Sequence, residues 1–215
     1  MTTEIFFSTN KVGVLTNNQV QEMLDRYNLG KLISIQETSK GVGKQTMFVS
    51  STAGEFVLKG NPLYEGQFVE EKFYIENLSE LTNLPLSLPY IVDQQNDIFG
   101  WTYAIMPRLS GVHFNDQDLK EQMNLEEKIE IVEVLVECLC KLHHWKVESY
   151  GEFDPKNYTI RPFHDSYKTW IYHRIRYWLE DAKKYSVITT KDVNWVEDLL
   201  LECEEAFDTL HSPHL

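Results

Sequence analysis

The sequence is poor in cysteine and in long apolar runs, and each shortage excludes a class of protein. Three cysteines in 215 residues are too few for a disulfide-stapled secreted domain, and Cys138 and Cys140 stand on different faces of an expected helix. No apolar run approaches the roughly 18 residues that span a bilayer, and residues 1–9 lack the basic start and apolar core of a signal peptide. We therefore expect reduced thiols, a cytoplasmic location and no membrane partner.

Basic residues are also scarce, because 20 Lys and Arg stand against 33 Asp and Glu and give a formal net charge of −13. Binding to nucleic acid requires basic patches that neutralise phosphates, so we expect no nucleic-acid partner. The chain does have enough apolar residues to form a hydrophobic core. Its 42% hydrophobic and 13% aromatic residues suffice for one large domain or two small lobes.

The first half of the chain has the pattern of a sheet with one helix across it. A short helix is expected at residues 17–28. Short apolar runs bounded by turn residues predict five strands, at residues 32–38, 45–51, 55–59, 90–92 and 99–106. Residues 66–81 have a helical period instead. The pattern predicts a five-stranded antiparallel sheet with one crossing helix, which forms an N-terminal lobe of residues 1–107.

After Pro107 the pattern is that of helix and loop only. Apolar residues recur at helical spacing in three stretches, residues 125–145, 171–185 and 193–210. The first stretch is so apolar that we expect its helix at the centre of a second lobe. The predicted class is therefore α+β with two lobes, of which the second, residues 108–215, is all-helical.

Lys59 and Glu71 are the most informative pair in the sequence. Lys59 closes the apolar run Phe56-Val57-Leu58, and a lysine at the end of a buried strand needs a partner charge or an anionic ligand. Glu71 lies on the inward face of the predicted helix. This is the arrangement of cation and carboxylate with which kinases hold ATP phosphates. The plain alternative is a snorkelling lysine and an exposed glutamate.

Two further features fit a nucleotide. Strand alternation puts Val57 on the same face as Lys59, where it would touch the base. Gly41 and Gly43 lie between the first two expected strands, where backbone N–H groups can close over phosphates, although many hairpins contain two glycines. A P-loop NTPase is excluded, because Gln45 stands where the Walker pattern requires Ser or Thr.

The ordered series of these motifs resembles the aminoglycoside phosphotransferase family of kinase-like enzymes. The series continues from Val57-Leu58-Lys59 and Glu71 into three later motifs, Ala104-Ile105-Met106-Pro107-Arg108-Leu109-Ser110-Gly111, Leu139-Cys140-Lys141-Leu142-His143 and Tyr150-Gly151-Glu152-Phe153. A tryptophan-bearing helix from Trp170 follows, as in the family. The resemblance covers nearly the whole chain from Leu32 onward, and the order of the motifs makes it specific.

The resemblance implies a kinase-like fold and a role for each matching residue. Lys59 would hold the α- and β-phosphates, Glu71 would orient Lys59, and Met106 would line the back of the adenine pocket. Adenine would be bound by the carbonyl of Pro107 and the amide of Leu109, and proline can serve because it lacks only the N–H. The expected cofactor is ATP with Mg, and the expected partner of the full-length protein is a small-molecule hydroxyl substrate.

The same resemblance shows what the 215 residues do not contain. The family's His-Gly-Asp loop, the Asn five residues after that Asp and the later metal-binding Asp are all missing, and residues 211–215 resemble the lead-in to the loop. We therefore expect a chain truncated before the catalytic loop, with no catalytic residue, no metal site and no turnover by itself. Its apolar helical faces would be exposed or covered by self-association, and the candidates are Trp170, Trp178, Phe207 and Leu210.

Two other classes stay open. A pseudokinase-like module would bind nucleotide or a partner without catalysis. A purely structural or interaction protein would leave Lys59 and Glu71 as an ordinary ion pair or as separate solvated groups. The identity of the acceptor is beyond the sequence.

Overall fold

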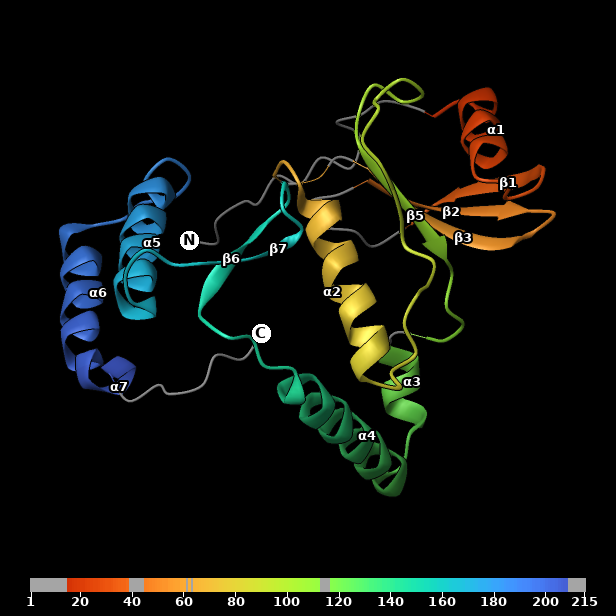
Figure 1. Ribbon diagram of the computed structural model, residues 1–215. Coiled ribbons are helices and arrows are strands. Elements are labelled where there is room, and N and C mark those ends of the chain that lie inside the picture. Colours follow the sequence, from red (N-terminus) through yellow and green to blue (C-terminus); the bar gives the residue numbers. More distant parts are fainter. Residues whose placement is uncertain (1–14, 39–44, 61, 63, 113–116, 209–215) are drawn as a thin grey trace. The chain divides into compact units, whose positions relative to one another are not determined.

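The computed structural model describes residues 15–38, 45–60, 62, 64–112 and 117–208 (Figure 1). The chain divides into two compact units, one that ends at Leu142 and one that begins at His143, and each is described by itself. The division into lobes at residues 107 and 108 stays a prediction.

The first unit is built on a five-stranded antiparallel sheet. Its strands lie in the order β1 (Leu32–Glu37), β2 (Gln45–Ser51), β3 (Gly54–Gly60), β5 (Tyr103–Pro107) and β4 (Ile91–Asp93). The central strand, β3, is therefore hydrogen-bonded on both sides. The predicted α+β class and the sheet of a kinase-like N-terminal lobe are confirmed.

Alternation along the strands gives the sheet two apolar faces, each covered by one helix. Phe56 and Leu58 of β3 belong to a core with Met23 and Leu24 of α1 (Asn17–Arg26). Val57 points to the opposite face and packs in a second cluster that contains Phe68 of α2 (Gln67–Leu81), Tyr90, Ala104 and Met106. A strand side-chain period of two thus decides which residues face α2.

A buried carboxylate ties α1 to the β4–β5 hairpin. Asp93, at the end of β4, is 3% exposed and accepts hydrogen bonds from Arg26, Tyr27, Tyr103 and the Gln95 amide at 2.7 to 2.9 Å. Burial by itself raises the pKa of Asp93, but these hydrogen bonds outweigh it and lower the pKa to about 2. The network fixes the strand that directly follows Tyr90.

The helix α4 (Leu125–His144) forms where the periodicity predicts it, after the short helix α3 (Gln117–Gln122). Asn124 caps it, since its side chain accepts from the Glu127 amide at 3.0 Å. The prediction that this helix is the centre of a lobe is wrong for the described structure, because its apolar side chains are about half exposed or more: Leu125, Ile129, Val132, Val136 and Leu139. Periodicity identifies the apolar face of a helix, but it does not supply a packing partner.

The second unit also differs from the prediction, because it is not all-helical. A two-stranded antiparallel hairpin, β6 (Gly151–Asp154) and β7 (Thr159–Pro162), precedes the helices α5 (Tyr167–Ala182), α6 (Thr190–Glu202) and α7 (Glu204–Asp208). Asp154 holds the turn by accepting from the Lys156 amide and the Asn157 side chain at 3.0 and 2.9 Å. Asp154 and Asn157 are therefore residues of the hairpin turn.

The hairpin escaped prediction because its strands are only four residues long and show no clear alternation. Gly151 marks the close approach of the two strands, since a Cβ at this position would lie 2.2 Å from the Arg161 carbonyl oxygen. Among the residues that the structure describes, no helix combines the length and the apolar character that crossing a membrane requires.

Candidate functional site

The strand β3 and the helix α2 bring Lys59 and Glu71 together. The Nζ atom of Lys59 lies 3.1 Å from Oε2 of Glu71, and the two side chains are 29% and 24% exposed. Lys59 lies on β3, the central strand of the sheet, and pairs with Ala104 of β5. Lys59 and Glu71 therefore form the contact that the sequence predicts for a strand-end lysine and an inward helical glutamate. This contact excludes the alternative in which the two side chains are separate and solvated.

The carboxylate of Glu71 is held at both oxygens. The Nε2 of Gln67, one helical turn earlier, donates to Oε1 at 3.1 Å, and the hydroxyl of Tyr90 donates to Oε2 at 2.5 Å. Tyr90 is only 2% exposed, and burial, followed by the hydrogen bond to Glu71, raises the pKa of its phenol well above the ordinary value. The Lys59 Nζ also lies 5.7 Å from the centre of the Tyr90 ring.

Neither Gln67 nor Tyr90 was identified from the sequence. The spacing of four residues between Gln67 and Glu71 on one helix is a signal that could have revealed Gln67. Tyr90 lies 19 residues from Glu71, just before β4, so only the fold brings its hydroxyl to the carboxylate.

Val57 and Met106, which are expected to contact adenine, lie on the same face of the sheet as Lys59. Val57 pairs with Met106 in the register of β3 and β5, and both side chains belong to the cluster that contains Phe68, Tyr90 and Ala104. Met106 is 6% exposed. Strand alternation therefore brings Val57, Lys59 and Met106 to the side of the sheet that α2 covers.

The segment after Met106 is positioned by backbone and side-chain hydrogen bonds. The Arg108 amide donates to the Glu55 carbonyl at 2.9 Å, which extends the pairing of β5 with β3. The hydroxyl of Ser87 donates to the carbonyl of Pro107, a contact that the sequence did not reveal. A carbonyl oxygen has two lone pairs, so this contact is compatible with a second donor on Pro107. Leu109 is half exposed.

Gly41 and Gly43 lie outside the described residues. Within the part of the chain that is described, no three His, Cys, Asp or Glu side chains gather into a group that could hold a metal ion. Lys59 fits the anionic phosphates of a nucleotide, because it is a partly exposed cation beside apolar side chains.

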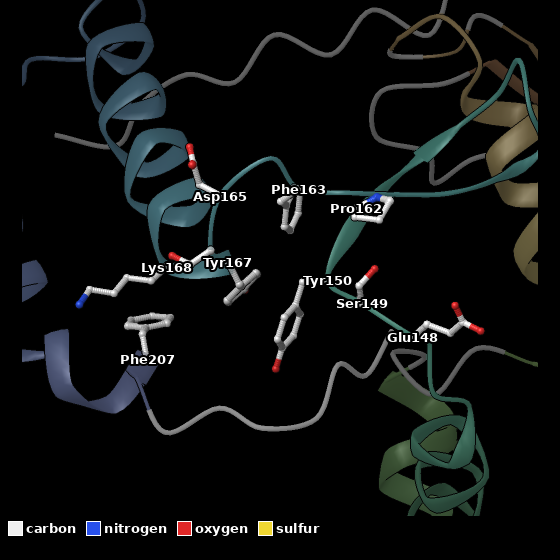
Figure 2. Close-up of a pocket in the computed structure, with 10 residues that line it drawn as sticks. Glu148, Ser149, Tyr150, Pro162, Phe163, Asp165, Tyr167, Lys168 and Phe207 are labelled. Atoms are coloured by element: carbon white, nitrogen blue, oxygen red, sulfur yellow. The ribbon is translucent and has the colours of Figure 1, made fainter.

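The second unit contains a cavity of about 470 Å³ with a different chemistry (Figure 2). Four aromatic side chains lie around it: Tyr150, Phe163, Tyr167 and Phe207. Glu148 and Asp165 lie at its rim with their carboxyl groups directed away from the rings, and Lys168 is ion-paired with Glu204 at 2.9 Å. This cavity offers ring faces to a ligand, whereas Lys59 and Glu71 offer a pair of opposite charges.

The sheet, the helix across it and the pair of Lys59 with Glu71 are those of a kinase-like N-terminal lobe. The family model described as "Phosphotransferase enzyme family" matches residues 34–206, which extend from β1 into α7, and the chain belongs to that family. The family resemblance seen in the sequence is thereby confirmed. Comparison with curated proteins gives no match.

Proposed function

We propose that the chain is the nucleotide-binding part of an ATP-dependent phosphotransferase that acts on a hydroxyl group of a small molecule. Membership of the phosphotransferase family supports the reaction class. The observation that carries the proposal is the contact of 3.1 Å between Lys59 Nζ and Glu71 Oε2, beside the apolar surface of Val57 and Met106.

Each residue has a distinct task in this proposal. The ammonium of Lys59 donates to oxygens of the α- and β-phosphates, and Glu71 fixes the direction of the lysine side chain. Val57 and Met106 pack on the adenine, while the Pro107 carbonyl accepts from it and the Leu109 amide donates to it. The backbone N–H groups of the segment with Gly41 and Gly43 cover the phosphates.

ATP supplies the phosphoryl group when bound, and phosphoryl transfer requires Mg²⁺ and an aspartate that positions the acceptor hydroxyl. The 215 residues contain no His-Gly-Asp sequence, so we propose that this chain alone does not turn over. A cytoplasmic location belongs to the same proposal, because three cysteines in 215 residues are too few for a disulfide-stapled secreted domain.

The same absence favours a second candidate, a pseudokinase-like module that binds nucleotide without transferring phosphate. Both candidates predict that the chain binds a nucleotide. They differ in whether the gene also encodes a catalytic loop after these 215 residues. An in-frame His-Gly-Asp sequence in the coding DNA after the codon for Leu215 favours the phosphotransferase, and a stop codon there favours the module.

Nucleotide binding is tested by titrating the chain with ATP in a thermal-shift experiment. A ligand at about 100 times its Kd stabilises the folded state by about 2.7 kcal/mol, so millimolar ATP should raise the Tm. Lys59→Ala removes a charge-assisted contact and should weaken ATP binding by about 10- to 100-fold.

The matched control is Lys31→Ala, because Lys31 forms an ion pair with Asp25 at 3.0 Å that is exposed to solvent. This variant should bind ATP as the wild type does. Absence of any stabilisation by millimolar ATP, or equal losses in the two variants, contradicts the proposal.

A further inference from the structure

We infer that Tyr90 is a positioning residue of the Lys59 site, and that its hydroxyl keeps Glu71 hydrogen-bonded when Lys59 turns part of its bonding capacity to a phosphate. Gln67 has the same role at the other carboxylate oxygen. The inference rests on the proposed function, because it concerns how Lys59 is shared between Glu71 and a nucleotide.

The geometry that carries the inference is the convergence of two donors on one oxygen. Lys59 Nζ and Tyr90 Oη both contact Oε2 of Glu71, at 3.1 and 2.5 Å. Gln67 Nε2 contacts Oε1 at 3.1 Å. Glu71 therefore has neutral donors on both oxygens in addition to its cationic partner.

These neutral donors matter because a half-buried carboxylate is costly to leave without partners. When the ammonium of Lys59 donates to a phosphate oxygen, its hydrogen bond to Glu71 lengthens, or its N–H donors are divided between Glu71 and the phosphate. Tyr90 and Gln67 satisfy the carboxylate in the meantime without cancelling its charge, so Glu71 continues to attract Lys59. A second cation in place of either neutral donor would compete with Lys59 for the carboxylate.

Tyr90 is suited to this role by its surroundings. Its ring is packed among Phe68, Ala104 and Met106, so the position of the hydroxyl is fixed by the core and not by a flexible side chain. Burial and the contact with Glu71 raise the pKa of the phenol, so it remains protonated and donates throughout the physiological pH range. The ring face is also 5.7 Å from Lys59 Nζ, which attracts the ammonium to the same place.

A packing role alone is the competing explanation, and Tyr90→Phe separates the two because it removes the hydroxyl and keeps the ring. The full chain is titrated with ATP and, separately, with adenosine, which lacks phosphates. We expect adenosine binding at wild-type strength and ATP binding about 5- to 20-fold weaker. Gln67→Met removes the other donor at similar volume and should lower the ratio of ATP affinity to adenosine affinity in the same direction.

Tyr27→Phe is the matched control, since it deletes a tyrosine hydroxyl that donates to a different carboxylate, Asp93, at 2.8 Å. It should leave the ratio of the two affinities unchanged. In a Glu71→Ala background, Tyr90→Phe should have no further effect, because its action passes through Glu71.

The outcomes distinguish this inference from the proposed function. If Lys59→Ala leaves ATP binding unchanged, the proposed function fails. If Lys59→Ala lowers the ratio of affinities but Tyr90→Phe and Gln67→Met do not, the positioning role is refuted and the proposed function stands. An equal effect of Tyr90→Phe with and without Glu71 also overturns the inference, because Tyr90 would then act on the nucleotide directly.

Discussion

Replacing Asp93 by Asn should destabilise the first unit in a way that depends on pH. The folded-state pKa of about 2, against 3.8 for an unperturbed aspartate, corresponds to about 2 kcal/mol of stability. Because the folded pKa is lowered, this contribution is full at neutral pH and is lost as the pH falls from about 4 towards 2. At pH 3 about half of it should remain.

The assay is urea denaturation of the wild type and of Asp93→Asn at a series of pH values from 7 to 3, followed by circular dichroism. The asparagine can accept hydrogen bonds, but it lacks the charge that Arg26 contacts at 2.7 Å. We expect the variant to be about 2 kcal/mol less stable at pH 7 and the two proteins to converge as the pH falls.

Asp97→Asn is the matched control, because Asp97 contacts the same Arg26 at 2.6 Å but its side chain is half exposed. Screening by water should make its effect clearly smaller than that of Asp93→Asn. If the difference between wild type and Asp93→Asn is the same at pH 7 and pH 3, the charge of Asp93 is not what stabilises the network.

Two further predictions concern the chain as a whole. When the purified chain is mixed with ATP, Mg²⁺ and hydroxyl acceptors, its rate of ADP formation should be no higher than that of the Lys59→Ala variant. ADP formation that requires both an acceptor and Lys59 would refute the proposed inactivity. Exposed apolar residues on the helices, such as Trp178, which is 52% exposed, should cause the chain to self-associate. Analytical ultracentrifugation should show that association increases with concentration and that Trp178→Glu weakens it. A strict monomer at all concentrations would contradict this prediction.

The parts of the site that follow from local periodicity were predictable. The alternation of Phe56, Val57, Leu58 and Lys59 shows which side chains share a strand face, and the helical period shows that Glu71 points inward. These two rules predicted the contact between Lys59 and Glu71. Met106 follows from the same alternation on a neighbouring strand once the register is known.

The parts that depend on contacts between distant segments were not predictable. Ser87 lies before the predicted strand 90–92 and Tyr90 begins it, but side-chain periods do not show that they contact Pro107 and Glu71. The short hairpin of β6 and β7 was missed for lack of alternation. The apolar face of α4 was identified correctly, whereas its exposure was not, because an apolar pattern does not specify what covers it.

The sequence by itself determined the α+β class, the approximate positions of the sheet strands and the pair Lys59 and Glu71, because these depend on side-chain periods along single elements. Only the tertiary structure decided how Glu71 is held. Its carboxylate contacts Lys59 of a strand, Gln67 of its own helix and Tyr90, which lies just before another strand. Hydrogen bonds of this kind require donors and acceptors within about 3 Å, and folding alone brings such distant residues that close.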